Sequence, residues 1–439
     1  MDWRARYAAK LATPEDAVKI VNSGDRVYAG MFSSTPPSLC QALFERNGEL
    51  RDVTILHYIA PFVWATPETR EAFRLVTLFS SAADRMAVRE GFADYLPVAN
   101  FRESLLTEIT GPIDVALVKT SPPDANGYMS FGAAVWTNRT ACSIARRIIC
   151  EVDESLIRTY GENFVHVSEV ELLAEPRDGA VAAAAESIPS RSPETIEAAE
   201  VICTLIAAEL IRDGDTIQIG LGDVTTALAL YLGDKHNLGI QTELIPGGVI
   251  ELVEQGVVTG TNKEVAPGKV VGSAFALLPP AELARAHMNP KFELWDFCHT
   301  DDLRLLVHER DFVAVNNALQ VDLTGQVTAE TVNGLTYSGP GGQTTFAVAA
   351  SVGDGGRSII AVPSSSIVEG VRRSRIFSTL PPGSVVTTPR TYVDYVVTEY
   401  GIATLRGKTL RQRAEEMVAV AHPEFRAELR REAGALMHL

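Results

Sequence analysis

Glu243 is a carboxylate placed where a catalytic group could act. It ends the apolar, strand-like run 238–242 and is followed by the turn Pro246–Gly248. Ligands of open α/β sheets bind at the carboxyl ends of strands, and glutamate is rarely fully buried unless it is paired or functional. A carboxylate there could be a nucleophile that forms a covalent intermediate. From context alone, a solvated carboxylate at a strand end is the commoner arrangement.

Two glycine-rich segments could bring backbone N–H groups close to a ligand. The first glycine segment, Gly220–Thr225, lies between a strand-like run and a helical stretch at Thr226–Gly233. Such a turn can offer unpaired N–H groups to an anion. It is not a dinucleotide fingerprint, because Thr225 stands where the third glycine is required. The second glycine segment, Ser338–Phe346, could supply an oxyanion hole or could be only a tight turn.

A second carboxylate, Glu399, follows the hydrophobic run Tyr395–Thr398, and Arg406 could be its structural ion-pair partner. The chain has no HExxH, GxxxxGK[ST] or GxSxG motif, and its histidines form no close ligand pairs. His57 and His166 each interrupt an apolar run, where a hydrogen-bonded core histidine is commoner than a catalytic one. We therefore expect no bound metal.

These residues must be held by short strands that alternate with helices. Nearly continuous apolar strands separated by helical patterns predict an α/β fold with mostly parallel sheets. The predicted strands are Val53–His57, Ile113–Lys119, Arg147–Glu151, Thr216–Gly220, Phe312–Asn316, Ser358–Val362 and Tyr395–Thr398.

The chain also resembles itself. Val21–Gly30 is similar to Ile211–Gly220 at an offset of 190 residues (21 to 211), and Asp124–Ser130 is similar to Asp322–Thr328 at an offset of 198 (124 to 322). Two matches in the same order at similar offsets indicate a duplication. We expect two similar open α/β domains.

The domain boundary is expected near residue 185, because prolines, glycine and an alanine run interrupt any regular element between residues 175 and 192. The predicted domains are 1–185 and 186–439, and the second contains Glu243. A helix should start at Ser192-Pro193 and end at Gly214. Its predicted apolar face comprises Ile196, Ala199, Cys203, Ile206 and Leu210.

Charge and composition exclude several classes of protein. The 439-residue chain carries a formal net charge of −16, which disfavours nucleic acid as a partner because phosphate binding needs a basic surface. A local basic patch such as Arg372–Arg375 could still bind a phosphorylated ligand. No apolar run reaches the ~18–20 residues that span a bilayer. The five cysteines form no CxxC pair, so a reducing, cytoplasmic compartment is expected.

Taken together, the motifs resemble the acetyl-CoA hydrolase/transferase branch of the class I coenzyme A transferases, most closely its 4-hydroxybutyrate type. The resemblance covers nearly the whole chain. Thr345 and Pro246 depart from the usual residues of the family, which bears on substrate preference more than on the reaction. The motifs are RTYGENFVHVSE at Arg158–Glu169, GLGDVTTAL at Gly220–Leu228, the pair Thr242-Glu243, NNALQVDLTGQV at Asn316–Val327, GPGGQTTF at Gly339–Phe346 and VVTEYGIATLRG at Val396–Gly407.

The resemblance implies an enzyme that moves coenzyme A between short-chain carboxylic acids through a glutamyl-CoA thioester on Glu243. Butyrate, 4-hydroxybutyrate, itaconate and acetate are the candidate acids. It also implies a homo-oligomer, with the coenzyme A thioester as substrate and no permanently bound cofactor. The net charge and the lack of a long apolar run lead us to expect no nucleic acid or membrane partner. The implied catalytic residues are Glu243, Leu221, Gly341, Gly342, Asn316 and Glu399, the backbone N–H groups of Leu221 and Gly341-Gly342 being oxyanion donors and Asn316 and Glu399 supporting the carboxylate. The residues implied to contact coenzyme A are Gly220, Gly222, Gly339, Gly341, Gly342 and Gln343.

Two alternatives remain open at this point. A hydrolase could use the same Glu243 with water as the final acceptor. A non-catalytic acyl-CoA-binding protein is also compatible with duplicated α/β domains, although retention of Glu243 beside both glycine segments favours catalysis.

Overall fold

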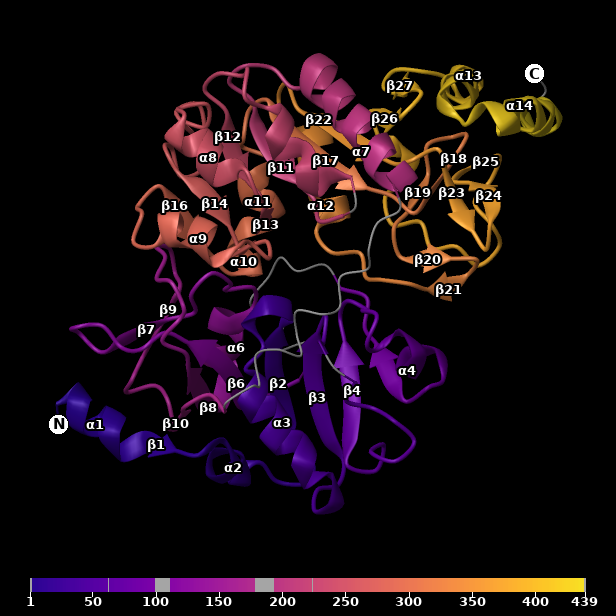
Figure 1. Cartoon of the computed structure of the whole chain (residues 1–439). Coiled ribbons are helices and arrows are strands. Elements are labelled where there is room, and N and C mark those ends of the chain that lie inside the picture. The colour runs from indigo at the N-terminus through magenta and orange to yellow at the C-terminus, as the bar shows by residue number, and fades with distance from the viewer. Residues whose placement is uncertain (1, 62, 99–110, 178–192, 223, 438–439) are drawn as a thin grey trace. The chain divides into compact units, whose positions relative to one another are not determined.

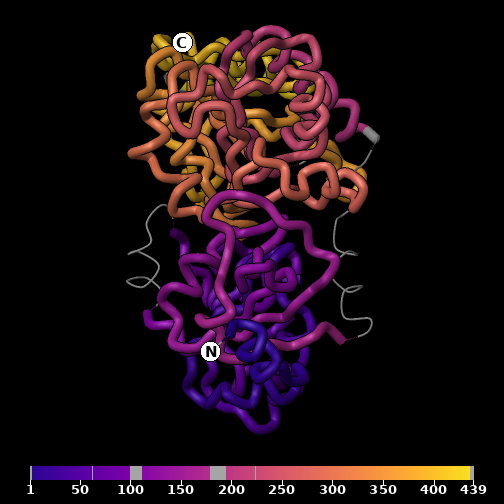
Figure 2. Tube along the Cα trace, turned by 90° about the vertical axis from the view of Figure 1, so that its left-hand side faces the viewer, coloured from indigo at the N-terminus to yellow at the C-terminus, as the bar shows by residue number. Residues whose placement is uncertain are grey.

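The computed structural model describes residues 2–61, 63–98, 111–177, 193–222 and 224–437, and the chain divides into two compact units (Figure 1). Unit 1 contains Met1–Pro189 and Ser273–Thr300, and unit 2 contains Ser190–Gly272 and Asp301–Leu439. In Figure 2 the indigo N-terminal residues run through unit 1 and the yellow C-terminal residues run through unit 2.

Unit 1 is built on one sheet in which every neighbouring pair of strands is parallel. Helices α1 (Trp3–Lys10), α2 (Pro14–Ala17), α3 (Pro37–Glu45), α4 (Arg85–Arg89) and α6 (Asn138–Ile144) accompany it. In spatial order its strands are β1 (Leu11–Ala12), β10 (Leu172–Ala174), β8 (Ala145–Val152), β6 (Ile113–Thr120), β2 (Arg26–Met31), β3 (Val53–Tyr58), β4 (Phe73–Thr77) and β5 (Ala93–Tyr95).

The sheet of unit 2 is parallel from β14 to β26, and its edge pair β26–β27 is antiparallel. Its helices include α7 (Pro193–Leu205), α8 (Val249–Glu254), α12 (Gln343–Val352), α13 (Leu410–Val420) and α14 (Pro423–Met437). The strands that unit 2 itself supplies to this sheet are, in spatial order, β14 (Val270–Gly272), β12 (Gly239–Gln241), β11 (Thr216–Ile219), β17 (Phe312–Asn317), β22 (Arg357–Ala361), β26 (Tyr395–Thr398) and β27 (Gly401–Thr404). The α/β fold and all seven predicted strands are confirmed.

The two sheets have the same order of connections, as a duplication requires. β2 lies between β3 and β6, and β11 lies between β12 and β17, so the two strands that open the repeated segments have corresponding places. The turns that precede them also agree: Gly24 has φ of 83° and Gly214 has φ of 84°. Glycine is favoured there because a side chain is strained at positive φ.

The second pair of similar segments forms the same turn in each unit. Asp124 Oδ1 accepts hydrogen bonds from the N–H groups two and four residues later, at 2.8 and 3.0 Å. Asp322 Oδ1 accepts the equivalent bonds at 2.9 and 3.0 Å. Both halves of the chain therefore build these turns with the same chemistry, which supports two similar α/β domains.

An Arg–Asp ion pair is repeated as well, although it is buried only in unit 2. Arg357 on β22 pairs with Asp215, with side chains only 5% and 2% exposed. Arg147 on β8 pairs with Asp25 at 3.5 Å, with side chains 34% and 16% exposed. In each unit the arginine lies on the strand two places from the one that the aspartate precedes.

The segment Ser273–Thr300 belongs to unit 1, whereas the predicted division placed it in a continuous second domain. The reason is that its backbone forms hydrogen bonds with residues of unit 1, and the sequence of the segment does not indicate these partners. Leu294 N–H donates to the Tyr160 carbonyl at 2.7 Å, and Phe297 N–H donates to the Trp136 carbonyl at 3.0 Å. The boundary predicted near residue 185 lies outside the described residues.

The helix predicted from Ser192-Pro193 to Gly214 differs in two details, and Ser192 lies outside the described residues. α7 continues as a π-helical turn that ends at Leu210, not at Gly214. Ile196 is 46% exposed and is not part of the apolar face. The other four predicted residues of that face are buried.

Of the two predicted core histidines, His57 is confirmed, because it is fully buried between Thr35 and Trp64, whereas His166 is hydrogen-bonded but partly exposed. Burial lowers the pKa of His57 to about 3. Four of the five cysteines are buried and Cys298 is partly exposed. Among the described residues, no helix has the length and apolar character needed to cross a membrane.

Candidate active site

The carboxyl ends of parallel strands bring the predicted residues to one edge of the unit 2 sheet. Since β11, β12, β17, β22 and β26 all run parallel, they end at the same edge. This edge is where ligands bind in open α/β sheets. Gly220 follows β11, Glu243 follows β12, Asn316 lies near the end of β17, and Glu399 follows β26.

Thr242 fixes the position of Glu243 by fastening the end of β12 to the end of β11. Its Oγ1 accepts a hydrogen bond from the Ile219 N–H at 3.2 Å and lies 3.1 Å from the Ile219 carbonyl oxygen. Thr242 is fully buried, and the next residue, Glu243, is partly buried. The threonine therefore holds the backbone from which the Glu243 side chain projects.

Glu243 contacts the second glycine segment. Burial raises the pKa of this carboxyl to about 7, and a hydrogen bond from the Gly342 backbone opposes that rise. A group that titrates near neutral pH is matched to catalysis there. When ionised, a carboxylate of raised pKa is also a stronger nucleophile than an exposed glutamate.

The second glycine segment is partly helical, because α12 begins at Gln343, with Gly342 as its N-cap residue. Gly341, just before it, has a positive φ of 53°. A Cβ at Gly342 would lie 2.5 Å from Phe346 Cε2 and 2.7 Å from Asp301 Oδ2, so only glycine fits. Phe346 packs against Phe312 of β17 and anchors this start of α12 to the sheet.

The first glycine segment is packed against Asn316. A Cβ at Gly220 would lie 2.8 Å from Asn316 Oδ1. The Asn316 side chain forms a reciprocal amide pair with Gln218: Asn316 Nδ2 donates at 3.0 Å and Gln218 Nε2 donates at 3.2 Å. The supporting role of Asn316 stays a prediction, and its amide is held by Gln218. The predicted helix at Thr226–Gly233 is a 3₁₀ helix, Thr225–Tyr231.

Asn317 and Gln343 form contacts that the sequence did not indicate. The Asn317 side chain donates to the Leu221 carbonyl at 3.2 Å, and Gln343 Nε2 donates to the Asn317 carbonyl. A Cβ at Gly222 would clash with the Asn317 amide. No local pattern marks such contacts, since each partner lies far away in the sequence.

Glu399 accepts two hydrogen bonds from Ser364, which follows β22. The Ser364 N–H donates at 2.9 Å and its hydroxyl at 2.5 Å. The ion pair expected between Glu399 and Arg406 is not the one that forms. Arg406 Nη1 instead donates to the Gly356 carbonyl at 2.9 Å and lies 3.8 Å from Asp394.

The remaining predicted residues lie on the two glycine segments. The Leu221 side chain is 53% exposed, and only its backbone was predicted to act. Gly339 follows Ser338, whose hydroxyl donates to the Ala329 carbonyl at 2.6 Å. Among the predicted site residues, the structure thus brings Glu243 together with Gly342, and Gly220 together with Asn316.

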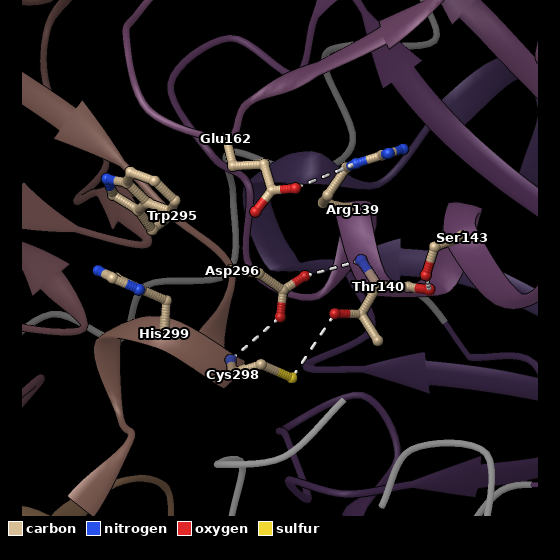
Figure 3. A pocket seen from close by; sticks show the side chains of 8 residues that line it. All are labelled: Arg139, Thr140, Ser143, Glu162, Trp295, Asp296, Cys298 and His299. Atoms are coloured by element: carbon tan, nitrogen blue, oxygen red, sulfur yellow. Dashed lines mark hydrogen bonds and ion pairs between the residues drawn. The ribbon is translucent and has the colours of Figure 1, made fainter. Parts of the chain in front are cut away.

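A separate cavity of about 230 Å³ lies within unit 1 (Figure 3). Burial raises the pKa of Asp296 in its wall to about 6, and the N–H groups of Thr140 and Cys298 donate to this carboxyl at 2.9 and 3.2 Å. None of the predicted site residues lines it. Its lining residues are Arg139, Thr140, Ser143, Glu162, Trp295, Asp296, Cys298 and His299.

Comparison with known proteins finds full-length relatives. Residues 1–184 match the model of the acetyl-CoA hydrolase/transferase N-terminal domain, and residues 282–433 match that of the C-terminal domain. A 4-hydroxybutyrate coenzyme A transferase from Clostridium kluyveri is 36% identical over 98% of this chain and 99% of its own. A succinyl-CoA:cyclohexane-1-carboxylate CoA transferase from Geobacter metallireducens is 33% identical over 97% of this chain and 95% of its own. The structure of RipA from Yersinia pestis matches with a TM-score of 0.89 at 30% identity, covering 100% of both chains.

Proposed function

We propose a covalent reaction mechanism for this chain, which belongs to the acetyl-CoA hydrolase/transferase family and is a CoA-transferase. In this route Glu243 takes coenzyme A from one short-chain acyl-CoA and passes it to a second carboxylic acid. One observation carries the proposal. Glu243 lies at the carboxyl edge of the unit 2 sheet against the Gly342 backbone, in a setting that raises its pKa to about 7.

The first half of the reaction loads coenzyme A onto the enzyme. A carboxylate oxygen of Glu243 attacks the thioester carbonyl, the carbon–sulfur bond breaks, and coenzyme A leaves as a thiolate. The product is a mixed anhydride between Glu243 and the acyl group. The thiolate then attacks the glutamyl carbonyl, so that the first acid departs as a carboxylate and a glutamyl-CoA thioester remains.

The second half repeats these steps in reverse. The carboxylate of the second acid attacks the glutamyl-CoA carbonyl and releases the thiolate, which gives a new mixed anhydride. The thiolate attacks the acyl carbonyl of this anhydride, so that a new acyl-CoA forms and Glu243 is restored as a carboxylate. Because the first acid leaves before the second reacts, the kinetics should be ping-pong.

The Gly342 N–H is suited to stabilise both intermediates. It already donates to a Glu243 oxygen, and negative charge collects on that oxygen when the thiolate attacks the glutamyl carbonyl. A donor fixed before the reaction stabilises this charge without reorganising. In the same proposal, the Leu221 and Gly341 N–H groups assist, and Asn316 and Glu399 support the reacting carboxylate.

The route needs no resident cofactor or metal, because every intermediate stays activated and coenzyme A enters as a substrate. We propose short-chain carboxylates as the acids, which include 4-hydroxybutyrate, butyrate, itaconate and acetate. Initial rates with each acid and either acetyl-CoA or butyryl-CoA would rank them. A chelator should leave these rates unchanged.

Location in the cytoplasm and self-association also belong to this proposal. The absence of CxxC pairs and the burial of four of the five cysteines support a reducing compartment. Light scattering of the purified protein would give its mass against the 47.4 kDa of one chain. Cell fractionation would test the compartment.

Trapping of the glutamyl-CoA thioester tests the route most directly. The protein is incubated with an acyl-CoA and no acceptor acid, and is then treated with borohydride, which reduces a thioester but not a carboxylate. Mass mapping should find the reduced residue at Glu243, and hydroxylamine should capture the same position. Modification at Glu399 or at Cys298 would contradict the assignment.

The same incubation separates transfer from hydrolysis. A transferase makes a new thioester when a second acid is added, whereas a hydrolase consumes the acyl-CoA and yields free coenzyme A. A protein that only binds acyl-CoA would give neither a covalent change nor turnover.

A further inference from the structure

Asn317, at the end of β17, fastens the first glycine segment. Its Nδ2 donates to the Leu221 carbonyl at 3.2 Å and to Thr225 Oγ1 at 2.5 Å. Its Oδ1 accepts from the Val224 N–H at 3.4 Å. One side chain therefore contacts residues on both sides of the turn that follows β11.

Gln343 joins the second glycine segment to the same asparagine. Its Nε2 donates to the Asn317 carbonyl, and its Oε1 accepts from the Thr388 hydroxyl at 3.2 Å. Gln343 is only 7% exposed. Since both ends of its amide bind the protein and little of it is exposed, the geometry favours a positioning role over the contact with coenzyme A that the resemblance implied.

We propose that Asn317 and Gln343 form a brace that fixes the two glycine segments at one spacing, with Gln343 as a positioning residue for the transfer reaction. The inference rests on the proposed function of Glu243. Gln343 is the first residue of α12 and directly follows Gly342, so holding its side chain holds the N–H group that contacts Glu243. A shift of about 1 Å at such a donor can cost a hundredfold in rate.

The strands of unit 1 that correspond to β17 and β22 show which residues stand at these positions in the unit that lacks Glu243. Strand pairing aligns Val115 with Arg147 in unit 1, and Val313 with the corresponding Arg357 in unit 2. Four residues farther along, unit 1 pairs Lys119 with Glu151, whereas unit 2 pairs Asn317 with Ala361. Two ionisable side chains are thus replaced by an amide and a methyl group in the unit that contains Glu243.

The loss of ionisable groups at these positions of unit 2 is consistent with a brace that lies beside a reacting carboxylate. Glu151 Oε2 accepts from the N–H groups of Ser38 and Leu39, at 2.8 and 3.0 Å, and so occupies the start of α3 with the protein's own carboxylate. In unit 2 the amides of Asn317 and Gln343 hold the equivalent edge without adding a charge near Glu243. The brace is therefore specific to the unit that has the glycine segments.

The first test compares Gln343→Met with Gln326→Met in the full-length protein. Gln326 is a matched control, because its Nε2 also donates one side-chain bond, to Asp322 Oδ2 at 2.6 Å. We expect Gln343→Met to lower kcat by about tenfold to a hundredfold, with the KM for acyl-CoA within about twofold of the parent value. Gln326→Met should keep the parent kcat. A rise in KM alone would overturn the brace and return Gln343 to coenzyme A binding.

The second readout is the pH profile of kcat/KM. The hydrogen bond from Gly342 lowers the pKa of Glu243. If Gln343→Met misplaces Gly342, this pKa should rise, and the acidic limb, the fall of kcat/KM at low pH, should begin at a higher pH. A purely structural role would leave the limb in place. If Gln343→Met does not fold, Thr388→Val removes only the bond to Gln343 Oε1 and should give a smaller shift in the same direction. An unchanged limb and kcat in Thr388→Val would also contradict the brace.

Trapping separates this inference from the proposed function. If the parent enzyme gives no borohydride-reduced Glu243, the covalent route fails and the brace fails with it. If the parent traps normally and Gln343→Met traps at the same rate, the brace alone is wrong.

Discussion

The Gly342 backbone donates a hydrogen bond to Glu243, so the start of α12 meets the end of β12. α12 and β12 are far apart in the sequence, so the contact between them could not be inferred from either segment alone. Together they place a carboxylate of raised pKa beside a donor that is fixed in advance, which is what anhydride and thioester chemistry requires.

Replacement of Glu243 tests the nucleophile. Glu243→Gln keeps the size of the side chain but removes its nucleophilic oxygen, so turnover should fall by roughly 10⁴–10⁶. Glu243→Asp should also be severely impaired, because the attacking oxygen moves back by about 1 Å. Initial rates and thermal unfolding of the three proteins decide this. A Gln variant that is folded and retains a few per cent of the parent rate would contradict the assignment.

The pH dependence of the rate should reflect Glu243. Burial raises the pKa of this carboxyl to about 7, and only the ionised form can attack. We therefore expect kcat/KM to be level above about pH 8 and to fall roughly tenfold per unit below pH 6. Measurement between pH 5 and 9, with an acid whose own ionisation is complete there, checks this. If kcat/KM instead fell only below about pH 4.5, the Glu243 carboxyl would be exposed in the working enzyme.

Gly220 should tolerate no side chain, in contrast to a nearby glycine. A Cβ at Gly220 would lie 2.8 Å from Asn316 Oδ1, whereas a Cβ at Gly233 would meet nothing within 4 Å. Gly220→Ala should displace the Asn316–Gln218 amide pair and lower kcat/KM by about tenfold or more. Gly233→Ala should keep the parent rate. Equal rates in the two variants would show that this packing is not needed for catalysis.

The repeated ion pairs should differ in their contribution to stability. Arg357→Met would leave Asp215 buried without its partner, which costs about 3–5 kcal/mol of the free energy of unfolding. Arg147→Met removes a pair in which the arginine is 34% exposed, so its cost should be about 1 kcal/mol or less. Urea unfolding of both variants compares them. Similar losses would mean that burial does not set the strength of these pairs.

Glu151 should make the stability of the protein depend on pH. Burial raises its pKa to about 7 from a usual 4.5, so the folded state holds a proton that the unfolded state releases between these values. The resulting stability is present below about pH 4.5 and is lost as the pH rises through about 7. Relative to the parent, Glu151→Gln should therefore gain stability between pH 5 and pH 8, at about 1.4 kcal/mol per unit of pKa shift. Urea unfolding at both pH values should show this gain, and a constant difference between the two proteins would contradict it.

The parts of the fold that sequence analysis predicted are those with a local cause. Apolar runs marked all seven strands, and glycine turns at Gly24 and Gly214 marked the duplication, because strand burial and positive φ leave a signature within a few residues. Local context marked Glu243 only as a carboxylate at a strand end, and its role as a nucleophile was implied by the resemblance and stays a prediction. The structure adds its contact with Gly342, which joins two such local features.

The parts that escaped prediction depend on contacts between distant residues. The bonds from Ser364 to Glu399 and from Gln343 to Asn317 use side chains that have many possible partners in a sequence. Arg406 illustrates the difficulty, since its nearness to Glu399 along the chain indicated a pair that the fold does not make. Tertiary geometry decides which donor meets which acceptor.

The assignment of Ser273–Thr300 to unit 1 has a consequence for synthesis of the protein. When the ribosome has completed the first half of the chain, the carbonyls of Tyr160 and Trp136 still lack the N–H donors that Leu294 and Phe297 later supply. A large part of unit 2 must be translated before unit 1 has all its residues. The two units therefore cannot fold as strictly successive halves during translation, and a gene cut near residue 185 should yield an incomplete first fragment.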